Sequence, residues 1–203
     1  ADRLARIGSD VRISVVYQDA PRGLGHAIGC ARSAVGNEPF AVLLPDELMG
    51  DSSLLTQMSE MFVQQGKSVV GLKQVPMSEV SAYGCVSTTA APTASGEVSV
   101  TGVVEKPALH EAPSDLILIG RYVLHTGMFE MLDALKPAPS GEIQLTDALL
   151  IEAQAGNLRG VVSNIARFDT GTPMGWLQAV IELTLQRKDA GTELEAWLKG
   201  RFS

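Results

Sequence analysis

The chain has 203 residues, 45% of them hydrophobic, and a net charge of -7 with a pI near 5.0. This is enough for one α/β domain with a substantial core. Lys and Arg are scattered singly, which argues against a nucleic-acid partner. No apolar run reaches the roughly 18–20 residues needed to span a bilayer, and no signal-peptide core is evident at the start. We therefore expect a cytoplasmic protein with no membrane contact.

Strands and helices alternate along the first third of the chain. The expected elements are a strand at 13–17, a helix at 26–35, a strand at 40–44, a helix at 53–65 with Gly66 as its stop signal, and a strand at 68–75. The strands are short runs of continuous apolar residues. Such runs, separated by helices, indicate a mainly parallel sheet covered on both faces. The predicted fold class is α/β.

The remainder is first β-rich and then helical. The expected elements are strands at 83–88, 97–105 and 117–124, helices at 127–135 and 143–155, a strand at 158–168, and helices at 173–187 and 192–199. Pro173 suits the first turn of its helix, and Thr192 with Glu195 resembles a capping box. We expect one domain spanning 1–203, with the carboxyl-terminal helices 173–199 as its last part.

A glycine-rich turn, QDAPRGLGHA, occupies residues 18–27. Gly23 and Gly25 follow a predicted strand and open a predicted helix, so they permit close approach of backbone N–H groups to a nucleotide. The spacing fits neither a P-loop nor a dinucleotide fingerprint. Taken alone, such a turn is more often a solution to packing than a binding site.

Carboxylates follow the ends of two predicted strands. In LLPDEL, Asp46 comes after an apolar run that stops at Pro45, and in VVEKP the pair Glu105 and Lys106 precedes Pro107. Ligands collect at the carboxyl ends of strands in open α/β sheets, where a carboxylate can hold a divalent cation or sugar hydroxyls and an ammonium can bind phosphate. A solvated acid or a surface ion pair explains each string equally well.

A third acid, Asp169, lies in RFDTGTP between a predicted strand and a helix. Considered by itself, it is better explained as a structural cap of the turn. Asp46 and Asp169 nevertheless both follow predicted strand ends, so we expect that they can converge on one metal ion although they are distant in sequence.

These strings, in this order, resemble bacterial UTP:glucose-1-phosphate uridylyltransferases, which are sugar nucleotidyltransferases. The resemblance covers nearly the whole chain and is carried by QDAPRGLGHA, LLPDEL, SAYGCV, TGVVEKP, APSDLILIGRYVL, GEIQLTDAL and FDTGTP. It implies a Rossmann-like nucleotidyltransferase fold with a mixed, mainly parallel central sheet flanked by helices. The reaction it implies is Mg²⁺-dependent transfer of a uridylyl group from UTP to glucose 1-phosphate, which yields UDP-glucose and pyrophosphate.

The resemblance also assigns roles on the nucleotide and metal side. It implies that Gln18 reads the uracil edge, because an amide both donates and accepts a hydrogen bond, and that Gly23 packs close to the base. It implies that Asp46 and Asp169 hold the magnesium ion.

On the sugar side, the resemblance implies that Glu105 holds glucose hydroxyls, that Lys106 neutralises the sugar phosphate and that Gly84 supplies a backbone contact. Lys106 and Asp46 would then be the catalytic residues. No side-chain nucleophile is needed, because the attacking phosphate oxygen is already charged; alignment and charge neutralisation suffice. Glu142 and Gln144 lie in a family-typical string, and their role is either functional or structural.

One departure from the family pattern is large. The glycine-rich Gly-x-Gly-Thr-Arg loop and the Pro-Lys segment that cradle the triphosphate occur nowhere in the chain. We therefore expect a fold that is incomplete at the amino end, a longer natural protein, and weak or no turnover by these 203 residues alone.

Two other functions stay open: a related sugar nucleotidyltransferase that uses dTTP, and a non-catalytic relative that binds a sugar nucleotide. An α/β domain without a ligand predicts instead that Asp46, Asp169, Glu105 and Lys106 do not face one cleft. Family members are homo-oligomers, which implies one here. Trp176 and Trp197 serve either such an interface or the core, and the core is the favoured interpretation.

Overall fold

The computed structural model describes residues 11–202, so residues 1–10 and 203 lie outside the description. The helices are α2 (Gly23–Cys30), α3 (Arg32–Val35), α4 (Ser53–Gln65), α5 (Met128–Ala134), α6 (Leu145–Gln154), α7 (Pro173–Leu185), α8 (Gly191–Phe202) and the 3-10 helix η1 (Met77–Ala82). The strands are β1 (Phe40–Leu43), β2 (Glu47–Met49), β3 (Ser68–Gln74), β4 (Gly84–Thr88), β5 (Glu97–Glu105), β6 (Leu116–Leu124), β7 (Leu158–Val162) and β8 (Arg167–Asp169).

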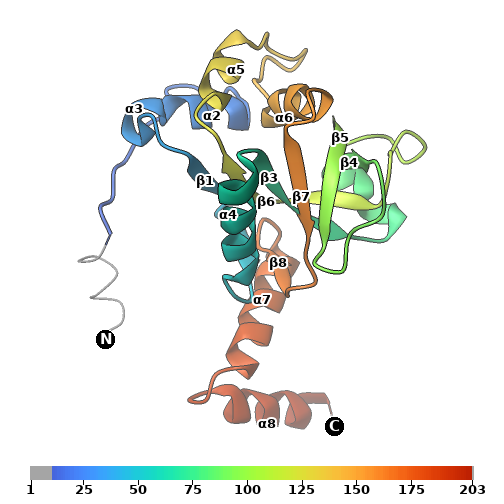
Figure 1. The fold of residues 1–203 in the computed structure, drawn as a ribbon. Coiled ribbons are helices and arrows are strands. Elements are labelled where there is room, and N and C mark those ends of the chain that lie inside the picture. The colour runs from blue at the N-terminus through green and yellow to red at the C-terminus, as the bar shows by residue number, and fades with distance from the viewer. Residues whose placement is uncertain (1–10, 203) are drawn as a thin grey trace.

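Six strands form a central sheet in the order β1-β6-β3-β7-β5-β4, and β2 pairs separately with β8 (Figure 1). β6 is buried along its whole length and pairs with β1, β3 and, through Cys85 and Ile117, with β4. The prediction of an α/β fold with a central sheet and helices is confirmed.

The prediction that this sheet is mainly parallel is wrong for the described strands. β1 and β3 run in the same direction, and β7 runs parallel to β3. However, β6 lies antiparallel between β1 and β3, and β5 lies antiparallel beside β7. Continuous apolar strands indicate burial on both faces, and burial does not fix the direction of the neighbouring strand.

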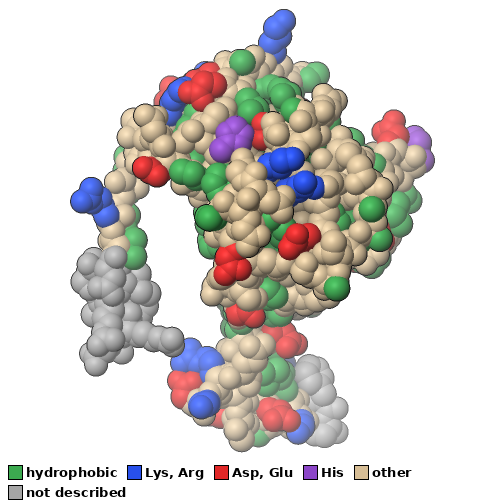
Figure 2. Space-filling model, viewed as in Figure 1, with side chains coloured by type: hydrophobic (Ala, Val, Ile, Leu, Met, Phe, Trp, Pro, Cys, Tyr) green, Lys and Arg blue, Asp and Glu red, His purple; other side chains and the backbone are tan. Residues whose placement is uncertain are grey.

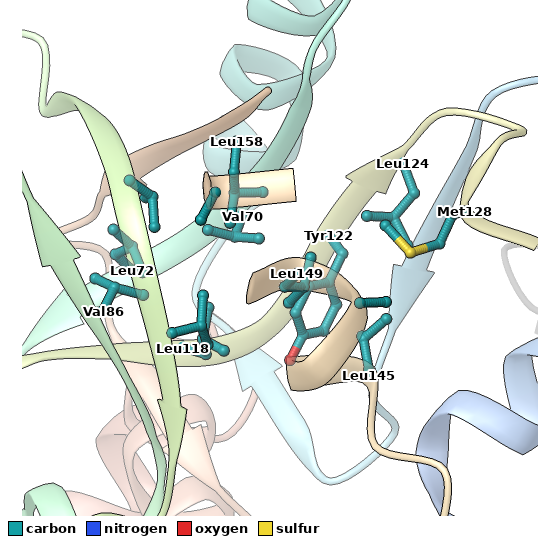
Figure 3. Packing of buried hydrophobic residues seen from close by; sticks show 14 of the residues in the cluster. Val70, Leu72, Val86, Leu118, Tyr122, Leu124, Met128, Leu145, Leu149 and Leu158 are labelled. Atoms are coloured by element: carbon teal, nitrogen blue, oxygen red, sulfur yellow. The ribbon is translucent and has the colours of Figure 1, made fainter. Parts of the chain in front are cut away.

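Helices cover both faces of the sheet. Neighbouring residues along β3 point to opposite faces, so their packing partners show which helix covers which face. Val69 packs with the α4 residues Leu54, Met58 and Met61. Val70 belongs instead to the larger core, to which α5 and α6 contribute and which contains Tyr122, Leu145 and Leu149 (Figure 3). The carboxyl-terminal helices are different: α7 packs on β8 and α8, and the two project away from the body in Figure 1.

Two predicted strands differ from the structure. Residues 13–17 form no strand, and the side chains there are exposed, for example Tyr17 at 86%. A β-branched run cannot form a strand without a partner, and none of the described strands pairs with it. The strand expected at 158–168 is two strands, because β7 belongs to the main sheet and β8 to the pair with β2.

The surface matches the charge pattern of the sequence. On the face drawn in Figure 2, Lys and Arg side chains are scattered without a continuous basic track. Within residues 11–202, no helix is long and apolar enough to cross a bilayer.

Candidate functional site

A cavity of about 310 Å³ opens where β1, β4, β5 and β6 meet the start of α6. Residues from the β1–β2 turn, from η1 and β4, from the end of β5, and from β8 line it. Six of the residues singled out in the sequence are among them: Asp46, Gly84, Glu105, Lys106, Gln144 and Asp169. The acids and the lysine that are far apart in the sequence therefore do share one cleft.

Gly84 packs closely against Glu105, the carboxylate predicted to bind glucose hydroxyls. It pairs with Glu105 across β4 and β5. A β-carbon at Gly84 would lie 2.9 Å from Leu118 Cδ1 and 3.3 Å from Glu105 Oε2. Only glycine therefore leaves the space in front of the Glu105 carboxylate open.

Lys106 has an unusual backbone conformation. Its φ of 42° makes it the single non-glycine residue with positive φ among residues 11–202. Its N–H donates to the carbonyl oxygen of Tyr83 at 3.1 Å, and the following Pro107 disfavours a right-handed helical alternative. Strained conformations of this kind persist where the surroundings impose them, most often at functional sites.

Asp46 and Asp169 are brought together by the β2–β8 pair. Glu47 lies opposite Asp169 in this register, and Thr170 donates to the Asp46 carbonyl oxygen from both its N–H (2.7 Å) and its hydroxyl (2.9 Å). A β-carbon placed on Gly171 would lie 3.1 Å from Asp169 Oδ1 and 3.4 Å from Asp46 Oδ2. The two carboxylates thus border the same small space.

The turn that carries Asp46 is fixed from behind by Arg121, which is 8% exposed. Its guanidinium donates to the carbonyl oxygens of Leu44, Glu47 and Gly120. Gly120, with φ of 58°, leaves room for the Glu47 side chain, since a β-carbon there would lie 2.8 Å from Glu47 Cγ. Sequence reasoning missed this contact, although a glycine within an apolar strand signals the close approach of another segment.

A buried ion pair adjoins the two acids. The Arg167 guanidinium donates to both carboxylate oxygens of Glu47, from Nε to Oε2 at 2.6 Å and from its second nitrogen to Oε1. Burial alone would lower the pKa of Arg167, but the hydrogen bonds and negative charge of Glu47 outweigh it, so the net shift of this pKa is upward. Arg167 therefore stays charged.

Tyr83 contacts both Asp169 and Lys106. Its hydroxyl donates to Asp169 Oδ2 at 3.2 Å, and its ring lies 4.9 Å below the Arg167 guanidinium carbon. Its carbonyl oxygen accepts the Lys106 N–H described above. Sequence reasoning used Tyr83 only as part of a string and gave it no role.

The cavity has an acidic character. Tyr122 is almost fully buried in its wall, and its pKa is raised, first by burial and then by the charges of Glu105, Glu47 and Asp46. An excess of carboxylates suits a bound cation, a lysine or sugar hydroxyls.

The donor set fits magnesium. Two carboxylates border one space, and the described residues contain no group of three or more His, Cys, Asp or Glu that could hold a metal ion. Mg²⁺ commonly takes one or two carboxylates and completes its shell with water and substrate phosphates. Asp46 and Asp169 are the residues that would hold it.

The predicted nucleotide residues Gln18 and Gly23 lie beside the cavity and do not line it. Gln18 Nε2 donates to the Gly23 carbonyl oxygen at 3.1 Å and contacts His26 Nδ1 at 2.8 Å. A β-carbon at Gly23 would lie 2.7 Å from the Ile143 carbonyl oxygen, so packing already explains this glycine. Their roles toward a base stay predictions.

The other two candidate residues, Glu142 and Gln144, lie just before α6 and differ in their position relative to the cavity. Gln144 lines the cavity, whereas Glu142 is not among the lining residues and accepts a hydrogen bond from Gln144 at 2.5 Å. Asp169 also fulfils the structural alternative raised for it, since its Oδ1 accepts the Gly171 N–H at 3.0 Å.

A sequence profile described as "Nucleotidyl transferase" matches residues 1–186. The chain belongs to the nucleotidyl transferase family. It is 35% identical over 198 residues to the UTP–glucose-1-phosphate uridylyltransferase YngB of Bacillus subtilis (strain 168), a match that covers 97% of the chain and 66% of that protein. It is 39% identical over 201 residues to the UTP–glucose-1-phosphate uridylyltransferase of Escherichia coli (strain K12), covering 93% of the chain and 64% of that protein. The chain thus spans slightly less than two thirds of these relatives.

Solved structures of the family have the same fold. A UDP-glucose pyrophosphorylase complexed with UDP-glucose matches with a TM-score of 0.85 and 34% identity, over 92% of this chain and 71% of that one. A UTP-bound enzyme from Acinetobacter baumannii matches with a TM-score of 0.84 and 35% identity, over 97% of this chain and 70% of that one. The prediction of a nucleotidyltransferase fold is confirmed.

Proposed function

We propose that the complete protein transfers a uridylyl group from UTP to glucose 1-phosphate, with Mg²⁺ as its cofactor. The observation that carries this proposal is the shared cavity of Asp46, Asp169, Gly84, Glu105 and Lys106. Support also comes from the relatives and structures named for this activity or bound to UDP-glucose and UTP.

In the proposed reaction, a phosphate oxygen of glucose 1-phosphate attacks the α-phosphorus of UTP, and pyrophosphate leaves as the bond to the β-phosphate breaks. Glu105 accepts hydrogen bonds from glucose hydroxyls in the space that Gly84 leaves open. Lys106 offsets the charge of the sugar phosphate and holds it in line with the α-phosphorus. Bound magnesium supplies further neutralisation of phosphate charge.

The test is calorimetric titration of the 203-residue chain with UDP-glucose, with and without Mg²⁺, for the wild type and Asp46→Asn. The proposal expects magnesium-dependent binding that the variant loses. Asp189→Asn is the matched control, because Asp189 is exposed between α7 and α8 and pairs with Arg187. It should bind as the wild type does.

A uridylyltransfer assay on the complete polypeptide tests the reaction itself. The expected result is release of pyrophosphate from UTP and glucose 1-phosphate, with UTP used in preference to dTTP when both nucleotides are present. A preference for dTTP would favour the related nucleotidyltransferase, and folded protein that binds UDP-glucose without turnover would favour the non-catalytic relative.

We also propose that the protein is a homo-oligomer in the cytoplasm, with the helical arm α7–α8 as the contact between copies. The prediction that Trp176 and Trp197 are core residues is wrong, because they are 57% and 58% exposed. The arm projects away from the body in Figure 1, and the two exposed tryptophans give it an apolar surface. Met174, at 62%, and Leu177, at 44%, extend this apolar surface.

Light scattering coupled to size exclusion tests the oligomer. The wild type should elute as a dimer or larger, and Trp176→Glu should shift the population toward monomer. A monomeric wild type at micromolar concentration would contradict the proposal.

A further inference from the structure

The acid Glu47 lies next to Asp46 in sequence but has a different environment. Its side chain is 9% exposed, and that of its partner Arg167 is 8% exposed. The pair joins β2 to β8 through both carboxylate oxygens. With both oxygens engaged by one guanidinium, Glu47 is not free to bind a cation in the cavity.

Arg167 also approaches the acid proposed for the metal. Its guanidinium nitrogen lies 3.7 Å from Asp169 Oδ2, the oxygen that accepts the Tyr83 hydroxyl. Arginine is always charged in proteins. Without Glu47, Asp169 would be the carboxylate left to offset this buried charge, so the existing Arg167–Asp169 ion pair would strengthen and the positive charge would oppose binding of a divalent cation.

We propose that Glu47 is a positioning residue that neutralises Arg167, so that the negative charge of Asp169 is available to a cation and is not taken up by Arg167. In this arrangement Tyr83 fixes the orientation of Asp169, and the Glu47–Arg167 pair sets its electrostatic surroundings. The inference rests on the proposed function for the identity of the cation as magnesium. It does not depend on turnover.

The first test measures Mn²⁺ affinity by electron paramagnetic resonance, with Mn²⁺ alone and with Mn²⁺ plus UDP-glucose, in the full chain. Glu47→Gln keeps the shape of the side chain and removes its charge. It should weaken Mn²⁺ binding by about tenfold or more, as expected for an uncompensated charge close to the site. Arg167→Met should leave the affinity unchanged or tighten it.

Opposite behaviour of the two single variants separates this role from general damage to the fold. If Arg167→Met weakens Mn²⁺ binding as strongly as Glu47→Gln, the pair is structural only and the proposal is wrong. Unchanged Mn²⁺ affinity in Glu47→Gln would overturn it as well.

A double variant covers the risk that the single variants fold poorly. Glu47→Met with Arg167→Met replaces a buried ion pair by apolar side chains, a change that proteins often accept without loss of stability. It should restore Mn²⁺ affinity to within about threefold of the wild type; a double variant that folds but binds as weakly as Glu47→Gln contradicts the proposal.

Failure of the proposed function gives a different pattern. If the wild type binds no UDP-glucose, uridylyltransfer is in doubt, but the ratio of Mn²⁺ affinities measured without nucleotide still decides the role of Glu47. Tyr17→Phe, which removes a hydroxyl from a side chain 86% exposed, is the control and should leave Mn²⁺ binding unchanged.

Discussion

The acid end of the cavity, formed by Asp46, Glu47, Arg167 and Asp169, and the segment at residues 11–18 differ in structure although both were predicted to contain strands. At the acid end, Glu47, Arg167 and Tyr83 form a closed network around Asp169. In the segment, Ile13 is 72% exposed and the β-branched run forms no strand. A motif acquires its geometry from the strands that flank it: β2 and β8 pair with each other, whereas the run at 13–17 has no paired strand among the described residues.

The largest expected effect contrasts the core with that segment. Leu149→Ala, at a fully buried position of α6 in the larger core, should lower the free energy of unfolding by about 2–5 kcal/mol through lost contacts and a cavity. Val15→Ala, at a side chain 70% exposed, should change it by less than about 0.5 kcal/mol. Urea unfolding of the 203-residue chain measures both. A large effect of Val15→Ala would show that the segment is packed in solution.

A second prediction concerns Gly84, which lines the cavity beside Glu105. Gly84→Ala places a methyl group 2.9 Å from Leu118 Cδ1 and in front of the Glu105 carboxylate. We expect the KM for glucose 1-phosphate to rise about tenfold, corresponding to a strain of 1–3 kcal/mol, while the Mn²⁺ affinity is unchanged. The control Gly200→Ala adds a methyl group with nothing within 4 Å of it. An unaltered KM in Gly84→Ala would remove Gly84 from the sugar site.

Much of this architecture follows from the sequence, and the failures have identifiable causes. The helix at 53–65 ends at Gly66, whose φ of 63° is the left-handed conformation that favours glycine. Asp46 and Asp169, singled out because each follows a predicted strand, line one cavity in the structure. Strand direction did not follow, because apolar runs encode burial and the antiparallel insertion of β6 is set by the tertiary fold.

The residues that position the acids of the site could not be predicted from the sequence as the acids themselves could. Arg121, Arg167 and Tyr83 act through contacts that join segments 74 to 120 residues apart, for which no local spacing exists. The apolar arm was misjudged for a related reason. Tryptophan is usually buried, and only the direction in which α7 leaves the body exposes Trp176.

A smaller effect separates the two cysteines, Cys30 and Cys85, which are both free in the structure. Cys85 is fully buried, and its pKa is raised by burial and then by the charge of Glu105, so less of it is thiolate at pH 8. Cys30 is only partly buried. Iodoacetamide should label Cys30 at least about tenfold faster than Cys85 in the native protein, by peptide mass spectrometry, and both equally in denaturant. Equal native rates would mean that β4 opens readily.

The smallest effect tests where the helical arm is anchored to the acid end. Thr172 caps α7, because its hydroxyl accepts the Gly175 N–H at 3.1 Å. Thr192, predicted to cap the last helix, instead lies inside α8, which begins at Gly191. Thr172→Ala should therefore destabilise α7 by about 1 kcal/mol, whereas Thr192→Ala should cost nothing, since alanine has the higher helix propensity.

Hydrogen exchange of the α7 amides measures this difference. The same experiment reports on β8, the strand that carries Asp169, because α7 packs on β8. If protection of β8 also falls in Thr172→Ala, the arm and the acid end form one cooperative unit; if β8 keeps its protection, the β2–β8 pair is stable without the arm.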